Sequence, residues 1–158
     1  KTMNKTILWC IGSPILLDDG AGPALFSELE AFPAEGVVPV NCETTPENWI
    51  APLSKNPPQV LMVADAADMG LPGGSVRRMN LEDTGGVTFS SHGIPLSLLL
   101  EPLKKSVEIE VIGIQPEKRG FGEGLSPEVS RAVQSVAQTI REGRTGELER
   151  YQENRSPR

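Results

Sequence analysis

The sequence predicts a three-layer α/β/α fold, in which helices flank a twisted, mostly parallel sheet in a single domain. Short apolar runs of strand length alternate with segments of helical periodicity along most of the 158 residues. The apolar runs are nearly continuous, which is typical of strands buried on both faces. Strands separated by helices imply right-handed crossovers, which place helices on both sides of a mostly parallel sheet. The chain length suits one domain with its own core.

The first half of the chain predicts three strands and two helices. Residues 6–12 are an apolar run, TILWCIG, that ends at a glycine. Pro23 suits the first turn of the following helix, because a proline there loses no hydrogen bond. Pro39 favours an edge position for the second strand, and Pro52 must bend or end the second helix. The predicted strands are residues 6–12, 37–42 and 59–66, and the predicted helices are residues 22–32 and 46–56.

The second half repeats this alternation. The sequence VRRM is predicted to be a short edge strand, and Pro102 interrupts the helix that follows it. The last helix has the clearest pattern, because Ser126 and Pro127 mark its start and Gly143 marks its end. The predicted strands are residues 76–79 and 107–116, and the predicted helices are residues 94–105 and 127–142.

The end of the chain differs in composition from the rest. Residues 144–158 contain one Tyr and one Leu among mostly charged and polar residues. Such a segment has too little apolar surface to form a packed core. We therefore expect a globular domain over residues 1–143 and a flexible tail over residues 144–158.

The charge balance limits the kinds of partner. Fifteen Lys and Arg residues against 21 Asp and Glu residues give a net charge of −6. Without a block of basic residues, nucleic acids and anionic membrane surfaces are poor partners. The apolar runs are too short to cross a membrane, and the N-terminal residues do not resemble a signal peptide. Cys10 and Cys42 fit no metal or redox spacing. We expect a cytoplasmic monomer with reduced thiols, no nucleic acid partner and no membrane insertion.

Carboxylates follow two of the predicted strands. Asp18 and Asp19 come after the first strand, and Asp65 and Asp68 come at the end of the third. Ligands of such sheets bind beyond the carboxyl ends of the strands, so all four should lie at one rim. Like charges raise one another's pKa, and a cation would stabilise the group. His92, the only histidine, lies in a polar loop, and two carboxylates with one imidazole suit Zn²⁺ or Ni²⁺.

Each of these residues also has a simpler interpretation. Asp19 could cap the helix that begins at the following glycines. Asp65 or Asp68 could only shape the turn of the sequence DMG. His92 could be an ordinary polar loop residue. Other chemistries fit less well, because no GxSxG motif occurs, a single histidine excludes HExxH, and GLPGGS lacks the lysine of a phosphate-binding loop.

Three motifs taken together resemble those of the hydrogenase maturation proteases. They are GSPILLDDGAGP, DAADMGL and SSHGIPL, in this order and followed by GIQP. The resemblance spans residues 7–143 and is strongest to the subgroup that serves hydrogenase 3. It implies a compact α/β endopeptidase that removes the C-terminal extension of the nickel–iron (NiFe) hydrogenase large-subunit precursor after nickel insertion. The alternative is a non-cleaving nickel sensor or large-subunit chaperone of the same fold.

The resemblance also implies the site residues. The residues that contact metal in the family fall on Asp19, Asp65 and His92, which we therefore expect to be both the metal ligands and the catalytic residues. The expected metal is nickel presented by the substrate, for which zinc or cadmium could substitute in vitro. Asp18 is then expected to serve the loop and the helix start, and Asp68 to shape its loop or support the site.

Several features of the mechanism stay open at this point. Nickel could polarise the scissile carbonyl or a water, or it could only mark the substrate while Asp19 or Asp65 acts as a general base. The family usually has Asn where this chain has Ser13, which is also polar, so we expect the turn to survive. The glycine-rich loop of residues 116–124 should face the same rim, either as a lid on the extension or as a plain surface loop.

Overall fold

The computed structural model describes residues 5–90 and 93–152. The strands are β1 (Thr6–Ile11), β2 (Val37–Glu43), β3 (Val60–Asp68), β4 (Val76–Met79), β5 (Thr88–Phe89) and β6 (Glu108–Ile114). Within this part of the chain they form a six-stranded sheet in the order β2-β1-β3-β6-β4, and β5 pairs with the end of β3. β1, β2, β3 and β6 are parallel, whereas β4 and β5 are antiparallel to their neighbours.

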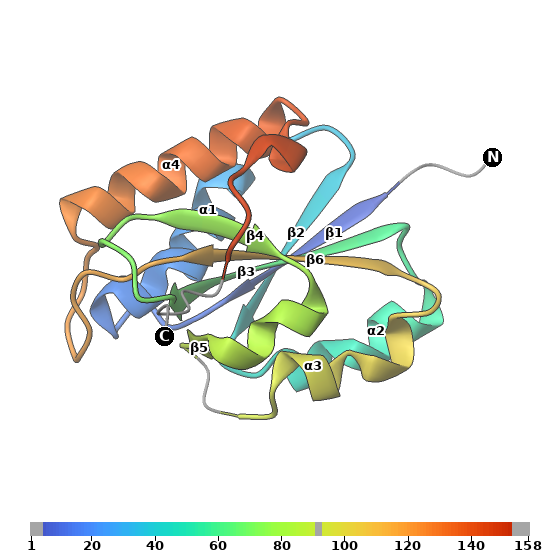
Figure 1. Ribbon diagram of the computed structural model, residues 1–158. Helices are drawn as coiled ribbons and strands as arrows, with labels where there is room; N and C mark the ends of the chain where they lie inside the picture. The colour runs from blue at the N-terminus through green and yellow to red at the C-terminus, as the bar shows by residue number, and fades with distance from the viewer. Residues whose placement is uncertain (1–4, 91–92, 153–158) are drawn as a thin grey trace.

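Helices cover both faces of this sheet. They are α1 (Ala21–Ala31), α2 (Ile50–Lys55), α3 (Leu96–Leu99) and α4 (Pro127–Arg141). α1 and α4 lie on one face, and α2 and α3 lie on the other (Figure 1). Each face has its own apolar cluster, one around Leu25 and Val133 and the other around Leu53 and Leu96. The predicted three-layer α/β/α fold with a mostly parallel sheet is therefore confirmed.

Both predicted edge strands lie at edges of the sheet. β2 contains Pro39 and pairs only with β1 among the named strands, and β4 pairs with β6. A proline that cannot donate to a neighbouring strand is tolerated there because one side of the strand has no partner strand. In the described ranges, none of the helices combines the length and the hydropathy needed to cross a bilayer.

Three elements differ from the prediction. The helix expected over residues 94–105 is reduced to α3 and a following 3-10 helix, Glu101–Leu103. Pro102 explains the break, because it has no backbone N–H with which to continue an α-helix. The helix expected over residues 46–56 begins with a 3-10 segment, Pro46–Trp49, before α2. β5 has no recognisable sequence signal, since two residues are too few to show a periodicity.

The tail expected to be flexible, residues 144–158, instead packs along edge strand β4 as far as the structure describes it. The Arg78 N–H donates to the Glu149 carbonyl at 2.9 Å, and the Arg78 carbonyl accepts the Tyr151 N–H at 2.9 Å. Leu148 and Tyr151 pack against the apolar clusters. An open sheet edge offers backbone partners to a segment of any composition, so residues 149–151 pair with β4 despite their polar composition, and the flexibility of the tail stays a prediction. The remaining residues of the tail lie outside the described ranges.

Candidate active site

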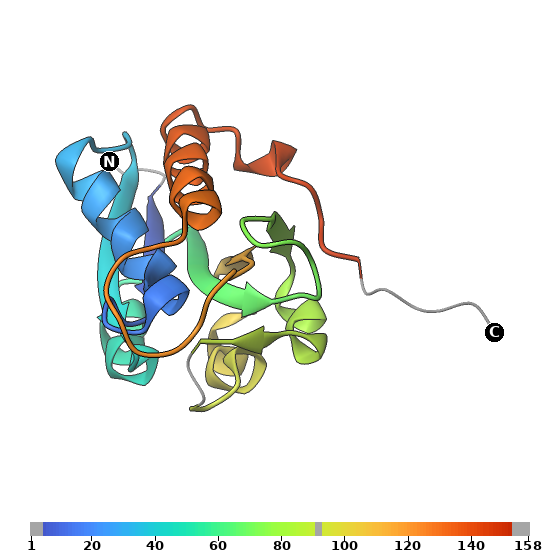
Figure 2. The same cartoon turned by 90° about the vertical axis from the view of Figure 1, so that its left-hand side faces the viewer.

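The carboxyl ends of β1, β3 and β6 meet at one end of the sheet, which faces the viewer in Figure 2. The loop after β1 and the loop after β6 lie side by side there. The Leu17 N–H donates to the Gly122 carbonyl at 3.0 Å, and the Gly122 N–H donates to the Ile15 carbonyl at 2.9 Å. The loop after β6 thus faces the predicted rim and is tied to it through backbone hydrogen bonds.

Two glycines position the loop after β1. Gly12 has a φ of 142°, and a Cβ atom there would lie 2.2 Å from the carbonyl oxygen of Asp19, so a side chain does not fit. That carbonyl also accepts the Ser13 N–H at 3.1 Å, so the turn survives with Ser at this position, as expected. A Cβ atom at Gly22 would lie 2.1 Å from the Ile11 carbonyl oxygen. The close approach of α1 to β1 therefore requires this second glycine.

Asp18 ties down the loop that follows β6. Its buried carboxylate accepts the N–H groups of Glu117 (2.8 Å), Lys118 (2.7 Å) and Ser126 (2.8 Å) and the Ser126 hydroxyl (2.8 Å). Burial alone would raise the pKa of Asp18, but these hydrogen bonds together outweigh it and lower the pKa below the usual value. Asp18 thus serves the loop, as expected, and its carbonyl accepts the N–H of Ala21, the first residue of α1, although no side chain caps that helix. The Ser126 hydroxyl, at the predicted start of α4, donates to Asp18 and does not cap the helix.

Asp19 lies next to Asp18 but faces a different partner. Its side chain is 10% exposed, and Oδ1 lies 3.2 Å from Nε of Arg119. The interpretation of Asp19 as a helix cap is wrong, since no side chain caps α1. Arg119 comes from the loop after β6, 100 positions further along the chain. This guanidinium is a counter-ion that the sequence pattern did not indicate.

Asp65 is buried on the α2 and α3 face of the sheet, within β3 rather than after it. The hydroxyl of Ser90 donates a hydrogen bond to its Oδ1 atom. Burial raises the pKa of Asp65 well above the usual value, the charge of Asp19 raises it further, and the hydrogen bond from Ser90 opposes both effects. The charge of Asp19 acts on Asp65, so the two acids share one electrostatic environment, and their role as a pair stays a prediction.

Asp68 shapes its own loop, as expected. Its Oδ1 atom accepts the Gly70 N–H at 3.2 Å and Nε2 of Gln115 at 3.2 Å. These hydrogen bonds lower the pKa of Asp68. Oε1 of Gln115 accepts the N–H groups of Met69 (2.7 Å) and Leu71 (3.3 Å). Gln115 belongs to the GIQP motif, and its role in holding the loop after β3 was not predicted.

The third predicted ligand and catalytic residue, His92, lies outside the described residues, so its role stays a prediction. Within residues 5–90 and 93–152, no three His, Cys, Asp or Glu side chains lie close enough together to hold a metal ion. Asp19 and Asp65 therefore supply at most two ligands. Any bound ion needs further ligands from outside this set.

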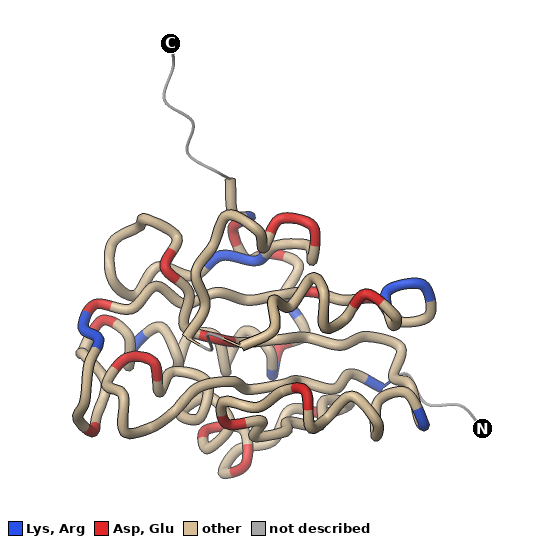
Figure 3. The backbone as a smooth tube through the Cα atoms, turned by 90° about the horizontal axis from the view of Figure 1, so that it is seen from below, with Lys and Arg blue, Asp and Glu red and all other residues tan. Residues whose placement is uncertain are grey.

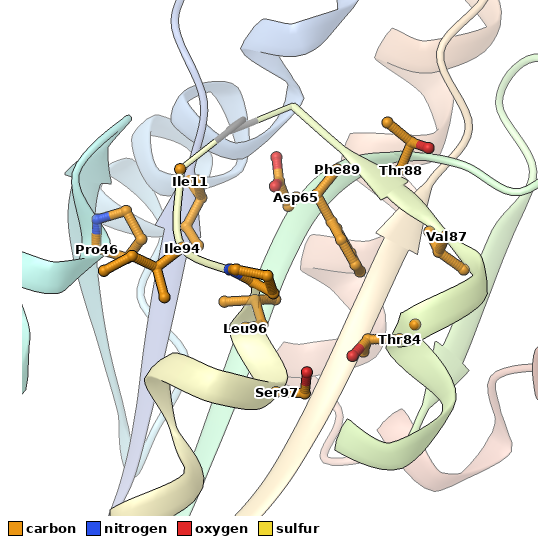
Figure 4. A pocket seen from close by; sticks show the side chains of 13 residues that line it. Ile11, Pro46, Asp65, Thr84, Val87, Thr88, Phe89, Ile94, Leu96 and Ser97 are labelled. Atoms are coloured by element: carbon orange, nitrogen blue, oxygen red, sulfur yellow. The ribbon is translucent and has the colours of Figure 1, made fainter.

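A cavity of about 300 Å³ opens beside Asp65. Figure 4 shows the Asp65 carboxyl group at one end of this space and the side chains of Thr84 and Ser97 at the other. The walls include the apolar side chains of Ile11 and Leu96 and the hydroxyl-bearing side chains of Thr84 and Ser97. A buried acid with a raised pKa next to a small cavity is an arrangement typical of an active site.

Comparisons with known proteins show the family of this chain. The HycI family model, described as hydrogenase maturation protease, matches residues 23–142. The chain belongs to the hydrogenase maturation protease family. The hydrogenase 3 maturation protease of Escherichia coli K12 is 33% identical over 136 residues, which are 85% of this chain and 87% of that protein. The resemblance identified from the sequence motifs is thus confirmed.

Solved structures of maturation proteases have the same fold. A crystal structure of a hydrogenase 3 maturation protease is 32% identical, with a TM-score of 0.84 over 94% of this chain and 97% of that chain. The solution structure of the E. coli endopeptidase HycI is 30% identical, with a TM-score of 0.87 over 96% of this chain and 99% of that chain. The protein is therefore a peptidase of the hydrogenase maturation type.

The charged residues of this maturation protease are distributed rather than clustered by sign. Lys and Arg lie on several separate segments of the backbone in Figure 3. At the rim, the guanidinium of Arg119 forms an ion pair with Asp19.

Proposed function

We propose that this hydrogenase maturation protease removes the C-terminal extension of a NiFe hydrogenase large-subunit precursor after nickel insertion. The observation that carries the proposal is the pair of buried acids, Asp19 and Asp65, at the rim beside a cavity. Membership of the family supports the peptidase activity, and the name of the E. coli relative supports a hydrogenase as the target. The acid pair further supports a nickel-dependent reaction of the aspartic type.

Nickel is proposed to enter the site as part of the substrate. Two acids buried together oppose each other's ionisation, and a divalent cation between them would remove that repulsion. Ni²⁺ takes more ligands than two carboxylates supply, so groups of the precursor, with His92 as the third protein ligand, would complete the shell. A precursor without nickel would bring no divalent cation to Asp19 and Asp65 and would bind more weakly. Zinc or cadmium is proposed to replace nickel in vitro.

The two acids are proposed to move protons during hydrolysis. One carboxylate takes a proton from the water that attacks the scissile carbonyl, and that proton then passes to the nitrogen of the departing extension. An acid with a raised pKa suits this exchange near neutral pH, which favours Asp65 for the role. The hydrogen bond from Ser90 would hold the Asp65 carboxyl group in one orientation.

The direct test compares a large-subunit precursor prepared with and without nickel. Each sample is mixed with the protease, and the precursor mass is measured before and after. Loss of a C-terminal peptide only from the nickel-loaded sample is the expected result. Binding without loss of mass would favour the non-cleaving chaperone, and cleavage regardless of nickel would mean that the acids form an ordinary hydrolytic site.

Removing the Arg119 charge is expected to strengthen cation binding at the acid pair. Arg119 competes with a cation for Asp19, from which it lies 3.2 Å away. Because this ion pair is partly exposed, we expect Arg119→Gln to bind Ni²⁺ about two- to fivefold more tightly than the unchanged protein. Isothermal titration with Ni²⁺ measures this, and Lys118→Gln is the control, since it removes the same charge from the adjacent position. Equal affinity for the two variants would contradict the role of Arg119.

We propose that the protease works as a monomer in the cytoplasm. Cys10 and Cys42 are buried and form no disulfide. Burial raises the pKa of the Cys42 thiol to about 12, so this group stays a thiol, and a reducing compartment suits it. Sedimentation of the purified protein tests whether it is a monomer in solution.

A further inference from the structure

A guanidinium occupies the place beside Asp19 where a cation would bind, because Nε of Arg119 lies 3.2 Å from Oδ1 of Asp19. We propose that Arg119 keeps free divalent cations out of the acid pair and gives way only to a cation that a bound precursor presents. This inference rests on the proposed function, since it assumes that nickel arrives with the substrate. It adds a blocking residue, by which the protease distinguishes a loaded precursor from a free metal ion.

The loop after β6, which lies at the rim (Figure 2), is fixed on both sides of Arg119. Before Arg119, the N–H groups of Glu117 and Lys118 donate to the Asp18 carboxylate at 2.8 and 2.7 Å, and the Lys118 carbonyl accepts the Asp18 N–H at 3.1 Å. After Arg119, Gly122 exchanges backbone hydrogen bonds with the loop that follows β1. The anchored loop therefore holds the guanidinium at one place on the rim.

The contact between Arg119 and Asp19 is nevertheless easily broken. Nε donates one hydrogen bond to Asp19, and the guanidinium makes no further hydrogen bond to residues 5–90 or 93–152. The Arg119 side chain is 33% exposed, so water can receive the guanidinium when another cation takes Asp19. A single, partly exposed contact of this kind holds less strongly than a bidentate ion pair. Arg119 can therefore be displaced while its loop stays in place.

The positive charge of Arg119 is permanent, because a guanidinium does not lose its proton in proteins. This charge also reaches a second acid of the rim. Hydrogen bonds from Gln115 and Gly70, together with the charge of Arg119, lower the pKa of Asp68. A guanidinium that leaves Asp19 thus remains near a negative charge, which makes its displacement less costly.

The block affects a free ion and a presented ion differently. A free Zn²⁺ or Ni²⁺ ion gains only the ligands of the site and must overcome the repulsion of Arg119. Nickel in a precursor is already held by groups of that chain, and the other contacts of the precursor raise its effective concentration at the rim. The same repulsion therefore keeps the acid pair empty at low concentrations of free metal, while a bound precursor overcomes it.

The first test measures how strongly free zinc inhibits cleavage of the nickel-loaded precursor, followed by mass. Zinc bound to Asp19 would occupy a ligand that the nickel of the precursor needs, so it should raise the apparent KM and leave kcat unchanged. We expect Arg119→Gln to be inhibited at a zinc concentration about two- to fivefold lower than the unchanged protease. Equal sensitivity of the two proteins to zinc would overturn the inference.

Two control variants separate the contact with Asp19 from the overall charge. Arg119→Lys keeps the positive charge and should retain most of the resistance to zinc. Lys118→Gln removes a charge from the adjacent position and should be inhibited like the unchanged protease. An equal loss of resistance in Lys118→Gln and Arg119→Gln would contradict the inference, because the net charge of the loop would then exclude the ion.

The second test does not depend on cleavage. Equilibrium dialysis against Zn²⁺ measures the zinc bound per chain, and Arg119→Gln should reach half-saturation at about two- to fivefold less zinc than the unchanged protease. In buffer without free metal ions, Arg119→Gln should cleave the loaded precursor no more slowly than the unchanged protease. A rate lower by about tenfold or more would mean that Arg119 assists the reaction itself, and would overturn the blocking role.

The two levels of the proposal fail differently in these experiments. If the unchanged protease cleaves the loaded precursor but Arg119→Gln shows the same zinc inhibition and zinc binding, the inference about Arg119 is wrong and the proposed function stands. If the unchanged protease cleaves no nickel-loaded precursor, the proposed function itself is wrong, and the role of Arg119 falls with it.

Discussion

Replacing Asp19 by Asn is expected to abolish processing of the nickel-loaded precursor while leaving the fold intact. Asn has almost the shape of Asp and keeps an oxygen that can accept a hydrogen bond from Arg119, but it removes the negative charge. Because that charge is proposed to attract the cation and to assist proton transfer, we expect cleavage to slow by at least about a hundredfold. The rate is measured from the mass of the precursor over time.

The control for Asp19→Asn is the same change at another acid of the rim. Asp68 uses Oδ1 to accept hydrogen bonds from Gly70 and Gln115, and Asn retains that oxygen. Asp68→Asn is therefore expected to cleave at close to the normal rate. Thermal unfolding of the two variants checks that both remain folded. Normal cleavage by Asp19→Asn would remove Asp19 from the site.

Replacing Asp18 by Asn is expected to cause a large loss of stability. Its fully buried carboxylate accepts four hydrogen bonds from the loop after β6, and an amide would turn an N–H group towards some of those donors. A buried group with several unmade hydrogen bonds costs about 3–5 kcal/mol in the free energy of unfolding. Urea denaturation measures this loss.

A graded comparison separates Asp18 from its partners. Ser126→Ala removes only the hydroxyl that donates to Asp18, while the backbone N–H of residue 126 still donates. This change is expected to reduce the free energy of unfolding by about 1 kcal/mol. A loss in Asp18→Asn as small as the loss in Ser126→Ala would show that the carboxylate does not organise the loop.

The stabilising effect of Asp18 is expected to depend on pH. The folded protein lowers the pKa of Asp18, so its ionised form contributes stability that is fully present above the unfolded pKa of about 3.9. That contribution is lost as the pH falls through the lower pKa of the folded state. The difference in unfolding free energy between the unchanged protein and Asp18→Asn should therefore shrink below about pH 4. Because the pKa of Asp65 is raised, its contribution to stability depends on pH in the opposite direction. Both proteins contain Asp65, so this contribution cancels in the difference.

The local pattern was sufficient to predict the main elements and the rim. β1 and most of β3 are continuous apolar runs, because strands covered on both faces need apolar residues at successive positions, and β6 alternates before it becomes apolar. Pro39 indicated that β2 is an edge strand, since a proline has no N–H to donate to a second neighbouring strand. Asp19 and Asp65 stand near the ends of parallel strands, and such ends meet at one side of a sheet. Each of these signals is carried by residues close together in the chain.

The partners of these acids could not be predicted in the same way. Asp18 accepts hydrogen bonds from Ser126, 108 positions away, and Asp19 pairs with Arg119, 100 positions away. Which loop meets which depends on how the sheet and helices pack, and no local periodicity records that. Ser90 likewise reaches Asp65 only because β5 pairs with the end of β3.

By itself, the sequence determined the α/β class, the order of the main strands and helices, the family, and the rim at which Asp19 and Asp65 stand. Hydrophobic periodicity, prolines and strand ends are local properties, so they can be read along the chain. Only the tertiary structure decided that Asp18 holds the loop after β6, that the tail pairs with β4, and that Asp65 adjoins a cavity. Those features arise from contacts between distant segments, and packing of the whole chain is what brings those segments together.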